Sequence, residues 1–244
     1  MTLLSSFARS SSSAVFIWGV LACTDAQGQK LTPEEVECGT FSQISRLTPE
    51  DYRRPSQRLK VVEDYHFGPM TEALVRPMQR GMTIGSDLDY TLWGYPNHHR
   101  ALVALVRLGA RERTDRPSGT QFTIDCYFRR ALRIASNDLI VRMLYANYLG
   151  SVNRKPYALR QMAYVVETAE GNPLTHYNAG LTYLELGAFP EALRQAHQAS
   201  ALGYGAPELE AELKRRGKWA DPPAAPSAGA SSPAVQAAPG ASSP

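Results

Sequence analysis

Residues 172–203 read NPLTHYNAGLTYLELGAFPEALRQAHQASALG. A capping side chain, Asn172, is followed by a proline, and Gly187 closes the apolar run that comes next. Pro190 and Gly203 punctuate the second half of the stretch in the same way. Proline in the first turn and glycine after the last turn are the preferred ends of a helix. The stretch therefore predicts a hairpin of two helices joined by a short loop.

The same punctuation extends in both directions from this hairpin. Asp138 and Pro156 precede Asn172 and Pro190 by equal intervals, so they predict an equivalent hairpin upstream. Further helices are expected at 98–108, capped by Asn97, and at about 121–135. A last helix is expected after Pro207 and before Gly217. The chain is thus predicted to be all-α, built from antiparallel helical hairpins.

The interval between the two hairpins, about 34 residues, is typical of tetratricopeptide repeats, and the residues at key positions resemble that family. The best copy carries Tyr177-Asn178-Ala179-Gly180, Tyr183, Phe189, Glu191-Ala192 and Ala199. One period earlier stand Ala146, Leu149 and Ala158, with Val165 replacing the second alanine. The resemblance covers residues 97–218 and implies a short solenoid that ends in a capping helix. The alternative is an unrelated helical bundle with accidental spacing.

The resemblance also implies where a ligand would bind. In this family the first helix of each repeat lines a concave face that holds a peptide or protein segment, and no cofactor or metal is involved. Lysines or arginines that would clamp a terminal carboxylate are not at the matching positions. The positions of this chain that match the ligand-contacting face are Met143, Leu144, Asn147, Tyr177, Asn178, Leu181 and Glu185.

Residues 27–96 are predicted to form a less regular region. Pro49 and Pro55 interrupt a polar loop, and residues 59–67 alternate briefly between apolar and polar side chains. A helix is expected from 69 to 80, stopped by Gly81. Another is expected at 88–93, with Ser86 or Asp87 as its cap.

The segment 85–100 is denser in functional groups than any other part of the chain. One interpretation is a secondary binding site, or the site of a metal-dependent or hydrolytic enzyme. The other is structural, with Asp87 as a helix cap and the aromatic side chains in the core. Adjacent histidines on a helix point in different directions, which disfavours a zinc pair. The residues concerned are Asp87, Asp89, Tyr90, His98, His99 and Arg100.

The amino terminus has the pattern of an export signal. Arg9 precedes a short apolar core, and cleavage after Ala26 would remove residues 1–26. Residues 20–23, VLAC, also resemble a lipoprotein signal spanning 1–22, in which case Cys23 would carry a lipid anchor. Export would leave Cys38 and Cys126 in an oxidising compartment, so we predict that they form a disulfide.

The carboxy-terminal residues 219–244 are rich in proline, alanine and serine and are expected to form an unstructured tail. The chain has a net charge of +3, and its only run of like charges is Lys214-Arg215-Arg216. We interpret that run as cations at the carboxyl end of a helix, where they face the negative end of the helix dipole, and not as a nucleic-acid contact.

Together these patterns predict a non-enzymatic scaffold or assembly factor of the bacterial cell envelope. It would be periplasmic or secreted, with membrane contact only through a lipid at Cys23, and its partner would be a protein or peptide. The rival prediction is the enzyme centred on Asp87, Asp89, His98 and His99. A third interpretation is a structural subunit whose groove holds its own amino-terminal segment.

Overall fold

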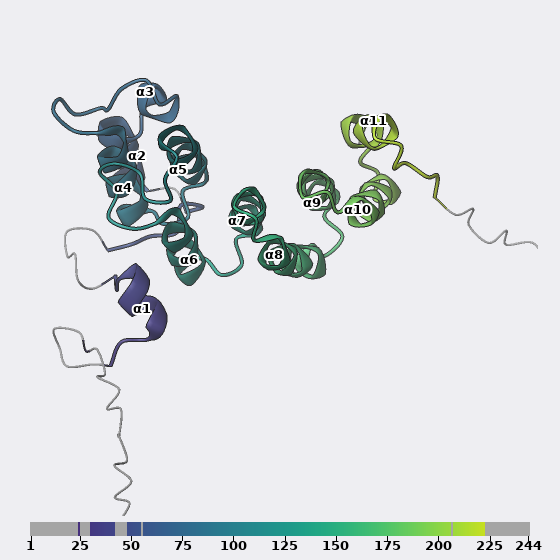
Figure 1. Ribbon diagram of the computed structural model, residues 1–244, viewed down its shortest axis with the longest axis horizontal. Helices are drawn as coiled ribbons and strands as arrows, with labels where there is room; N and C mark the ends of the chain where they lie inside the picture. Colours follow the sequence, from purple (N-terminus) through teal and green to yellow (C-terminus); the bar gives the residue numbers. More distant parts are fainter. Residues whose placement is uncertain (1–23, 25–29, 42–47, 55, 206, 223–244) are drawn as a thin grey trace, which may run out of the picture. The chain divides into compact units, whose positions relative to one another are not determined.

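A computed structural model describes residues 24, 30–41, 48–54, 56–205 and 207–222. Within these residues the regular elements are α-helices, accompanied by one isolated bridge between Thr24 and Lys30 (Figure 1). The all-α prediction is confirmed. The predicted signal apart from Thr24, with the anchor residue Cys23, and the tail from residue 223 lie outside the described residues. None of the described helices is both long enough and apolar enough to cross a membrane.

The helices fall into two compact units, Met1–Ser136 and Asn137–Pro244. Of the predicted repeat region, the first helical pair therefore belongs to unit 1 and the remainder to unit 2. Unit 2 contains α7 (Leu139–Ser151), α8 (Lys155–Thr168), α9 (Pro173–Glu185), α10 (Phe189–Ala201) and α11 (Pro207–Arg215).

In unit 2, α7 packs against α8 and α9 packs against α10, so that two helical hairpins follow one another. Helix α9 also contacts α7, α8 and α11. Figure 1 shows the resulting two layers, with α7 and α9 in one and α8 and α10 in the other. The face of the α7–α9 layer is therefore formed by the first helix of each hairpin.

The capping residues predicted for unit 2 are confirmed. The Asp138 side chain accepts a hydrogen bond from the Val141 amide, and the Asn172 side chain accepts bonds from the Leu174 and Thr175 amides. The chain turns with positive φ at Gly187 (+65°), where a residue with a side chain would be strained. Local chemistry thus fixes these helix ends.

Small residues allow the hairpin of α9 and α10 to close tightly. Ala179, Ala192 and Ala199 are fully buried between the helices. A methyl group placed on Gly180 would lie 3.5 Å from the Ala192 carbonyl oxygen and 2.4 Å from the Leu209 side chain in α11. Interiors are packed too densely to accept such an overlap without movement.

Unit 1 contains six helices in its described part. They are α1 (Pro33–Cys38), α2 (Gln57–His66), α3 (Pro69–Glu72), α4 (Ile84–Gly94), α5 (His99–Glu112) and α6 (Ile124–Ile134). Helix α4 packs on α2 and α5, and α6 contacts both α5 and α1. The core between them is made largely of leucine and aromatic side chains, including Leu88, Leu92, Leu102, Leu105, Tyr127 and Phe128.

Several helix limits predicted in unit 1 are wrong. All but the last of the alternating residues 59–67 lie in helix α2, which Ser56 caps through the Leu59 amide and which ends at His66. The helix expected to reach Arg80 ends at Glu72, because the chain turns at Leu74 with φ +58°. Helix α4 begins earlier than expected, since Thr83 is its cap and Asp87 lies inside it.

The expected cap of α5 is also wrong, because His98 replaces Asn97 in that position. The Asn97 side chain instead accepts a hydrogen bond from the Tyr52 amide at 2.8 Å and donates one to Asp51 Oδ1 at 2.7 Å. It therefore ties the loop before α2 to the start of α5. That loop lies more than forty residues earlier in the chain.

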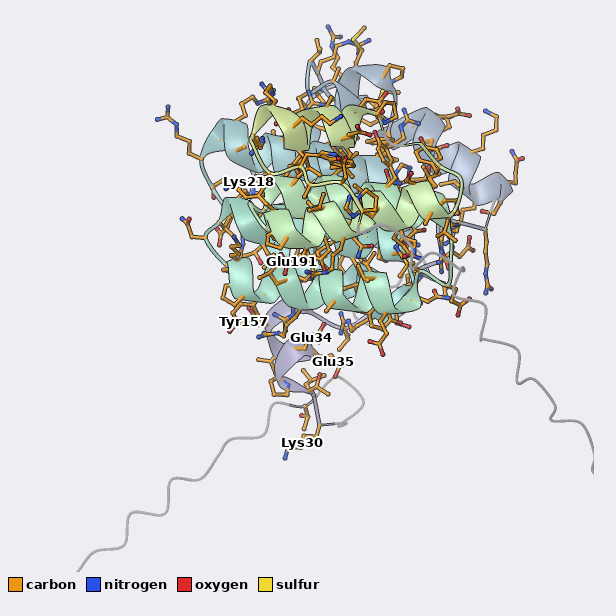
Figure 2. All side chains as sticks on the ribbon, turned by 90° about the vertical axis from the view of Figure 1, so that its right-hand side faces the viewer. Lys30, Glu34, Glu35, Tyr157, Glu191 and Lys218 are labelled. Carbon is orange, nitrogen blue, oxygen red and sulfur yellow. A yellow bond between two sulfur atoms is a disulfide. The ribbon has the colours of Figure 1, made fainter. Side chains whose placement is uncertain are left out.

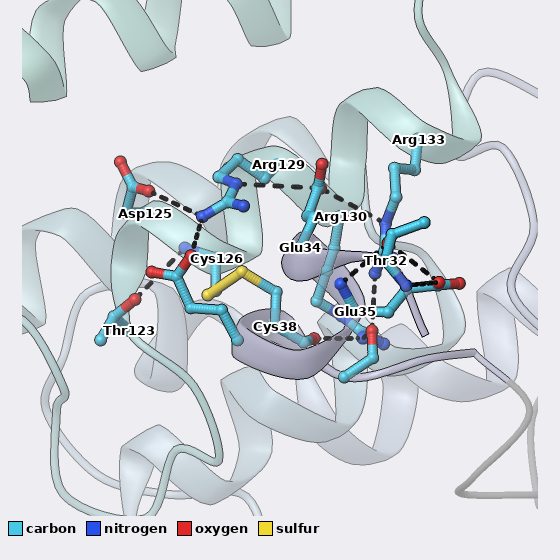
Figure 3. A network of polar contacts seen from close by, with 12 residues as sticks. Thr32, Glu34, Glu35, Cys38, Thr123, Asp125, Cys126, Arg129, Arg130 and Arg133 are labelled. Atoms are coloured by element: carbon cyan, nitrogen blue, oxygen red, sulfur yellow. Dashed lines mark hydrogen bonds and ion pairs between the residues drawn. A yellow bond between two sulfur atoms is a disulfide. The ribbon is translucent and has the colours of Figure 1, made fainter. Parts of the chain in front are cut away.

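The predicted disulfide between Cys38 and Cys126 is present and joins α1 to α6 (Figure 3). Three arginines of α6 also hold α1 in place. Arg129 pairs with Glu37 at 2.6 Å, and Arg133 donates to the Gly39 carbonyl at 2.8 Å. Cations at the end of a helix stabilise carbonyl groups that have no partner within it.

Arg130 is the most deeply buried of the three arginines, with 1% of its surface exposed. Its Nη1 donates to the carbonyls of Cys38 (2.9 Å) and Gly39 (3.3 Å). Its guanidinium lies 4.2–4.8 Å from the ring centres of Trp93, Phe41 and Phe122. Burial lowers the pKa of Arg130 to about 10, and these carbonyls and rings offset the cost of burying the cation.

Candidate functional site

The exposed sides of α7 and α9 carry equivalent residues. Positions 140, 144, 147 and 151 of α7 each lie one repeat period before positions 174, 178, 181 and 185 of α9. Spacings of three and four residues place each set on one side of its helix. We call this surface the α7/α9 face, and it consists of Ile140, Leu144, Asn147, Ser151, Leu174, Asn178, Leu181 and Glu185.

Apolar side chains lie open to solvent at one end of the α7/α9 face. Ile140 is 46% exposed and Leu174 is 50% exposed, although both lie in the first turn of a well-formed helix. Leu144 and Leu181 are half-buried one or two turns further on. Apolar residues that recur at the same place in two adjacent helices form a surface suited to bind apolar side chains of a partner.

A pocket of about 290 Å³ lies at the other end of the α7/α9 face. It brings together Asn147 and Glu185, two of the residues that the repeat phase predicted. Sequence reasoning missed its other residues, although the period relates Ser151 to Glu185 and could have identified it. The other residues that line the pocket are Gly150, Ser151, Lys155 and Leu186.

The carboxamide of Asn147 is the least satisfied polar group of this pocket. Its Oδ1 atom is shielded from solvent, and no hydrogen-bond donor among the described residues reaches it. An unpaired buried acceptor costs roughly 1–3 kcal/mol. A ligand that presents an N–H group to Asn147 would recover this free energy.

Charged groups of both signs border the pocket. Glu185 is exposed at the end of α9, and Lys155 is exposed at the start of α8. Gly150 has no side chain, which lets Leu186 approach: a methyl group there would lie 2.4 Å from the Leu186 Cδ2 atom. The pocket therefore offers an acceptor, a cation and a carboxylate beside an apolar contact, as a peptide main chain with mixed side chains requires.

Of the remaining residues predicted for this face, two are already engaged within the protein. Met143 is only 8% exposed and belongs to the core. The Tyr177 ring packs against Tyr204 with centroids 5.1 Å apart, and its hydroxyl donates to Glu208 at 3.3 Å. Burial and the neighbouring Glu208 raise the pKa of Tyr177. Both residues support the face from behind or beside it.

The residues of the 85–100 segment are held by different partners. Asp87 is fully buried; its Oδ1 lies 3.0 Å from His66 Nδ1, and its Oδ2 accepts the Met78 amide at 2.6 Å. Asp89 accepts hydrogen bonds from the Gln121 amide and the Tyr127 hydroxyl. Burial raises the pKa of Asp89. Each carboxylate therefore connects a helix to a loop or a neighbouring helix.

His98 is buried and neutral. Its Nδ1 accepts the Ala101 amide at 3.1 Å, which leaves Nε2 to donate to Glu63 at 3.1 Å. Burial lowers the pKa of His98 to about 4 against the opposing effect of Glu63. His98 thus caps α5 and connects it to α2.

His98 also packs against the Tyr52 ring, with ring centres 4.2 Å apart, and His99 shares this neighbour. His99 packs edge-on against Tyr52 at 5.3 Å, and Arg100 donates to Glu72 at 2.8 Å. Tyr90 stacks on His66 at 3.8 Å. Within the described residues, the only three side chains close enough to share a metal ion are Glu37, Cys38 and Cys126, and the two cysteines are bonded to each other. Asp87, Asp89, His98 and His99 do not converge.

Comparison with known proteins adds no assignment. No family model matches the chain, and no curated protein or solved structure matches it. The residues and contacts of the two units are therefore the basis for a functional proposal.

Proposed function

We propose that the chain is a protein-binding scaffold of the tetratricopeptide type, whose α7/α9 face holds a peptide or protein segment. The observation that carries this proposal is the Asn147 Oδ1 atom, which has no partner among the described residues and lies in a pocket at the end of an exposed apolar surface. Asn147 Oδ1 accepts a main-chain N–H of the ligand, while Ile140 and Leu174 contact its apolar side chains.

The packing of unit 2 supports the repeat assignment. The caps of the two hairpins, Asp138 and Asn172, are one repeat period apart, and α8 and α9 are in contact as consecutive helices of such an array are. Helix α11 covers the end of the second hairpin through Leu209 and Leu213, which are fully buried. A terminal helix of this kind protects the last repeat from solvent.

The disulfide supports the proposed location. Disulfides persist in oxidising compartments such as the bacterial periplasm and are rare in the cytosol. The bond between Cys38 and Cys126 therefore favours an exported protein that works as an adaptor or assembly factor of the cell envelope. Its partner would be another polypeptide of that compartment.

Affinity purification of charge-bearing variants tests the proposal. Ile140→Glu places a charge on the α7/α9 face without disturbing the core, because Ile140 is 46% exposed. Leu202→Glu is the matched control at the end of α10, where Leu202 is 38% exposed. Polypeptides that bind to the wild-type chain and to the Leu202 variant should be lost from the Ile140 variant by about tenfold or more, since a buried unpaired charge is costly.

Equal recovery of the same polypeptides by all three proteins would contradict the proposal, because the α7/α9 face would then play no part in binding. Circular dichroism of the variants separates loss of binding from loss of the helical fold.

A further inference from the structure

A basic and apolar surface lies on unit 1 where α5 runs beside α3 (Figure 1). Four residues of α5 follow one another at intervals of three or four positions and so lie on one side of the helix. They are Arg100, Val103, Arg107 and Arg111. Two contacts turn this side towards α3 and the turn after it. Arg100 pairs with Glu72, and Arg111 donates to the Leu74 carbonyl at 2.6 Å.

Apolar side chains of this surface are open to solvent. Val75 is 65% exposed, the highest value for a large apolar side chain among the described residues, and Met70 is 45% exposed. The two lie side by side, because the Val75 amide donates to the Met70 carbonyl at 2.8 Å. Val103 is 38% exposed on α5. Since the chain turns at Leu74 with φ +58°, the most exposed of these side chains stands on a turn and not in a groove.

The same surface carries an excess of positive charge. Arg76, Arg107 and Arg111 are exposed, and none of the three forms an ion pair with a described residue. The nearby Glu72 is already engaged by Arg100. Residues 65–86 and 98–111 contain no other acidic residue. Three guanidinium groups without an ion-pair partner thus accompany the exposed apolar side chains.

This combination fits the surface of an anionic membrane. Guanidinium groups bind phosphate oxygens through paired N–H donors, and each cation near an anionic bilayer adds to the attraction. Apolar side chains enter the boundary between head groups and acyl chains, while the long arginine side chains keep their charges at the head groups. A protein partner would have to offer a recess that fits the turn, whereas lipid head groups separate around it.

We propose that this surface, the α3/α5 patch, docks unit 1 on an anionic phospholipid membrane. The patch consists of Met70, Val75, Arg76, Val103, Arg107 and Arg111. All of them belong to unit 1, so the patch shares no residue with the α7/α9 face of unit 2. It also differs from the lipid predicted at Cys23, because it needs no covalent modification. The test of the patch is therefore independent of both.

Co-sedimentation with lipid vesicles tests this inference in the full chain carrying Cys23→Ser, which cannot be lipidated. The protein should bind mixed vesicles, made of phosphatidylglycerol and phosphatidylcholine in equal parts. Phosphatidylcholine alone should bind it at least about tenfold more weakly, and added salt should weaken binding to mixed vesicles.

A pair of arginine variants locates the charge. Arg107→Gln should weaken binding to mixed vesicles about fivefold, because one cation is lost at the membrane surface. Arg194→Gln is the matched control, since it removes a 66% exposed cation of α10, and it should alter binding less than about twofold.

A second pair of variants separates insertion from attraction by charge alone. Val75→Ser keeps every cation but removes an apolar side chain, so binding to mixed vesicles should fall by about threefold or more. Val152→Ser, at a 41% exposed valine of unit 2, should have no effect.

Tryptophan fluorescence shows directly whether the turn enters the bilayer. The emission of Val75→Trp, relative to the parent chain, should shift to shorter wavelengths on mixed vesicles. Tyr157→Trp is the control, because Tyr157 is 48% exposed in unit 2 (Figure 2), and its emission should not shift.

Three results would overturn the inference. One is that the Cys23→Ser chain does not bind mixed vesicles at low salt. Another is that Val75→Ser, or Met70→Ser if Val75→Ser fails to fold, binds them as tightly as the parent chain. The third is that Arg107→Gln weakens binding of a labelled glutamate peptide but leaves vesicle binding unchanged, which would assign the patch to an acidic protein.

Discussion

The polar side chains of His98 and Asn147 differ in whether their hydrogen-bonding atoms have partners within the protein. His98 has a partner on each ring nitrogen, Ala101 and Glu63, so its role is complete within the fold. Asn147 Oδ1 has no partner among the described residues. The sequence could not separate these cases, because the Glu63 partner lies 35 residues from His98 and only tertiary packing brings it near.

The depressed pKa of His98 makes unit 1 sensitive to acid. The unfolded chain protonates this histidine near pH 6.5, whereas the folded chain resists protonation until about pH 4. Unfolding therefore takes up a proton between these values, and stability should fall by up to about 3 kcal/mol as the pH drops through that window. Urea unfolding, monitored by hydrogen exchange of α5 peptides, measures this loss.

His98→Asn should flatten the pH dependence of α5 unfolding, although it lowers stability at neutral pH. His197→Asn is the control, since His197 lies on α10 in unit 2. An unchanged pH dependence in the His98 variant would show that other groups cause the acid sensitivity.

Gly180 tests the close packing of unit 2. Gly180→Ala introduces a methyl group 2.4 Å from Leu209, which is fully buried and cannot move freely. The overlap should outweigh the better helix propensity of alanine and lower the free energy of unfolding by about 1–3 kcal/mol. Gly205→Ala has no atom within 4 Å of the new methyl group and should be neutral or slightly stabilising. Chemical denaturation measures the free energy of unfolding of unit 2 in both variants. Equal values for Gly180→Ala and Gly205→Ala would contradict the close packing around Gly180.

At the scale of helices, the sequence predicts unit 2 better than unit 1. Helix α9 begins at Pro173 after an asparagine cap and ends before Gly187, all of which are local signals. In unit 1, helix α1 was not predicted, although Thr32 and Glu35 form a capping box around Pro33 and so give a local signal for its start. What the sequence could not show is how α1 packs on α6. Arg130 contacts the Cys38 carbonyl across 92 residues of sequence. Such a contact cannot be predicted from spacing along the chain.

The disulfide is the main covalent anchor of α1. Replacing Cys38 and Cys126 together by alanine opens a link with a sequence separation of 88 residues. The free energy of unfolding of unit 1 should fall by about 3–5 kcal/mol, and the amides of α1 should exchange rapidly. Hydrogen-exchange mass spectrometry measures both, and unit 2 peptides serve as the internal control.

Glu37→Gln provides the matched variant for α1. It removes only the exposed ion pair with Arg129 and should cost less than about 1 kcal/mol. Should the double alanine variant behave like Glu37→Gln, the disulfide would contribute little to holding α1 on α6.

At the scale of the whole molecule, the sequence predicted part of the α7/α9 face, but it missed Ile140 and Leu174 at the apolar end and did not predict the pocket. The repeat period predicted Asn147 and Glu185, and the pocket contains both. Lys155 and Leu186 could not be predicted from the repeat period. Lys155 begins α8 and Leu186 follows α9, so neither occupies a position of the α7/α9 face. Met143 was wrongly placed on the surface, since a helix phase alone does not show how deeply a neighbouring helix packs.

The metal content of the purified protein tests the rival enzyme prediction directly. Asp87 and His98 are bonded to protein groups, so purified protein should contain no stoichiometric zinc or copper, and a chelator should leave its melting temperature unchanged. Elemental analysis and thermal unfolding with and without chelator give the answer. One bound metal ion per chain would revive the metal-dependent alternative.

Photo-crosslinking inside the producing cell tests the α7/α9 face most directly. A photoreactive amino acid at Leu174, which is 50% exposed, should form adducts with a discrete polypeptide. The same amino acid at Gln198, an exposed position of α10, should not. We predict that the photoreactive group at Leu174 gives adducts and that their yield falls when Ile140 is also changed to glutamate. Absence of polypeptide adducts at Leu174, or equal adducts at Gln198, would contradict binding at this face.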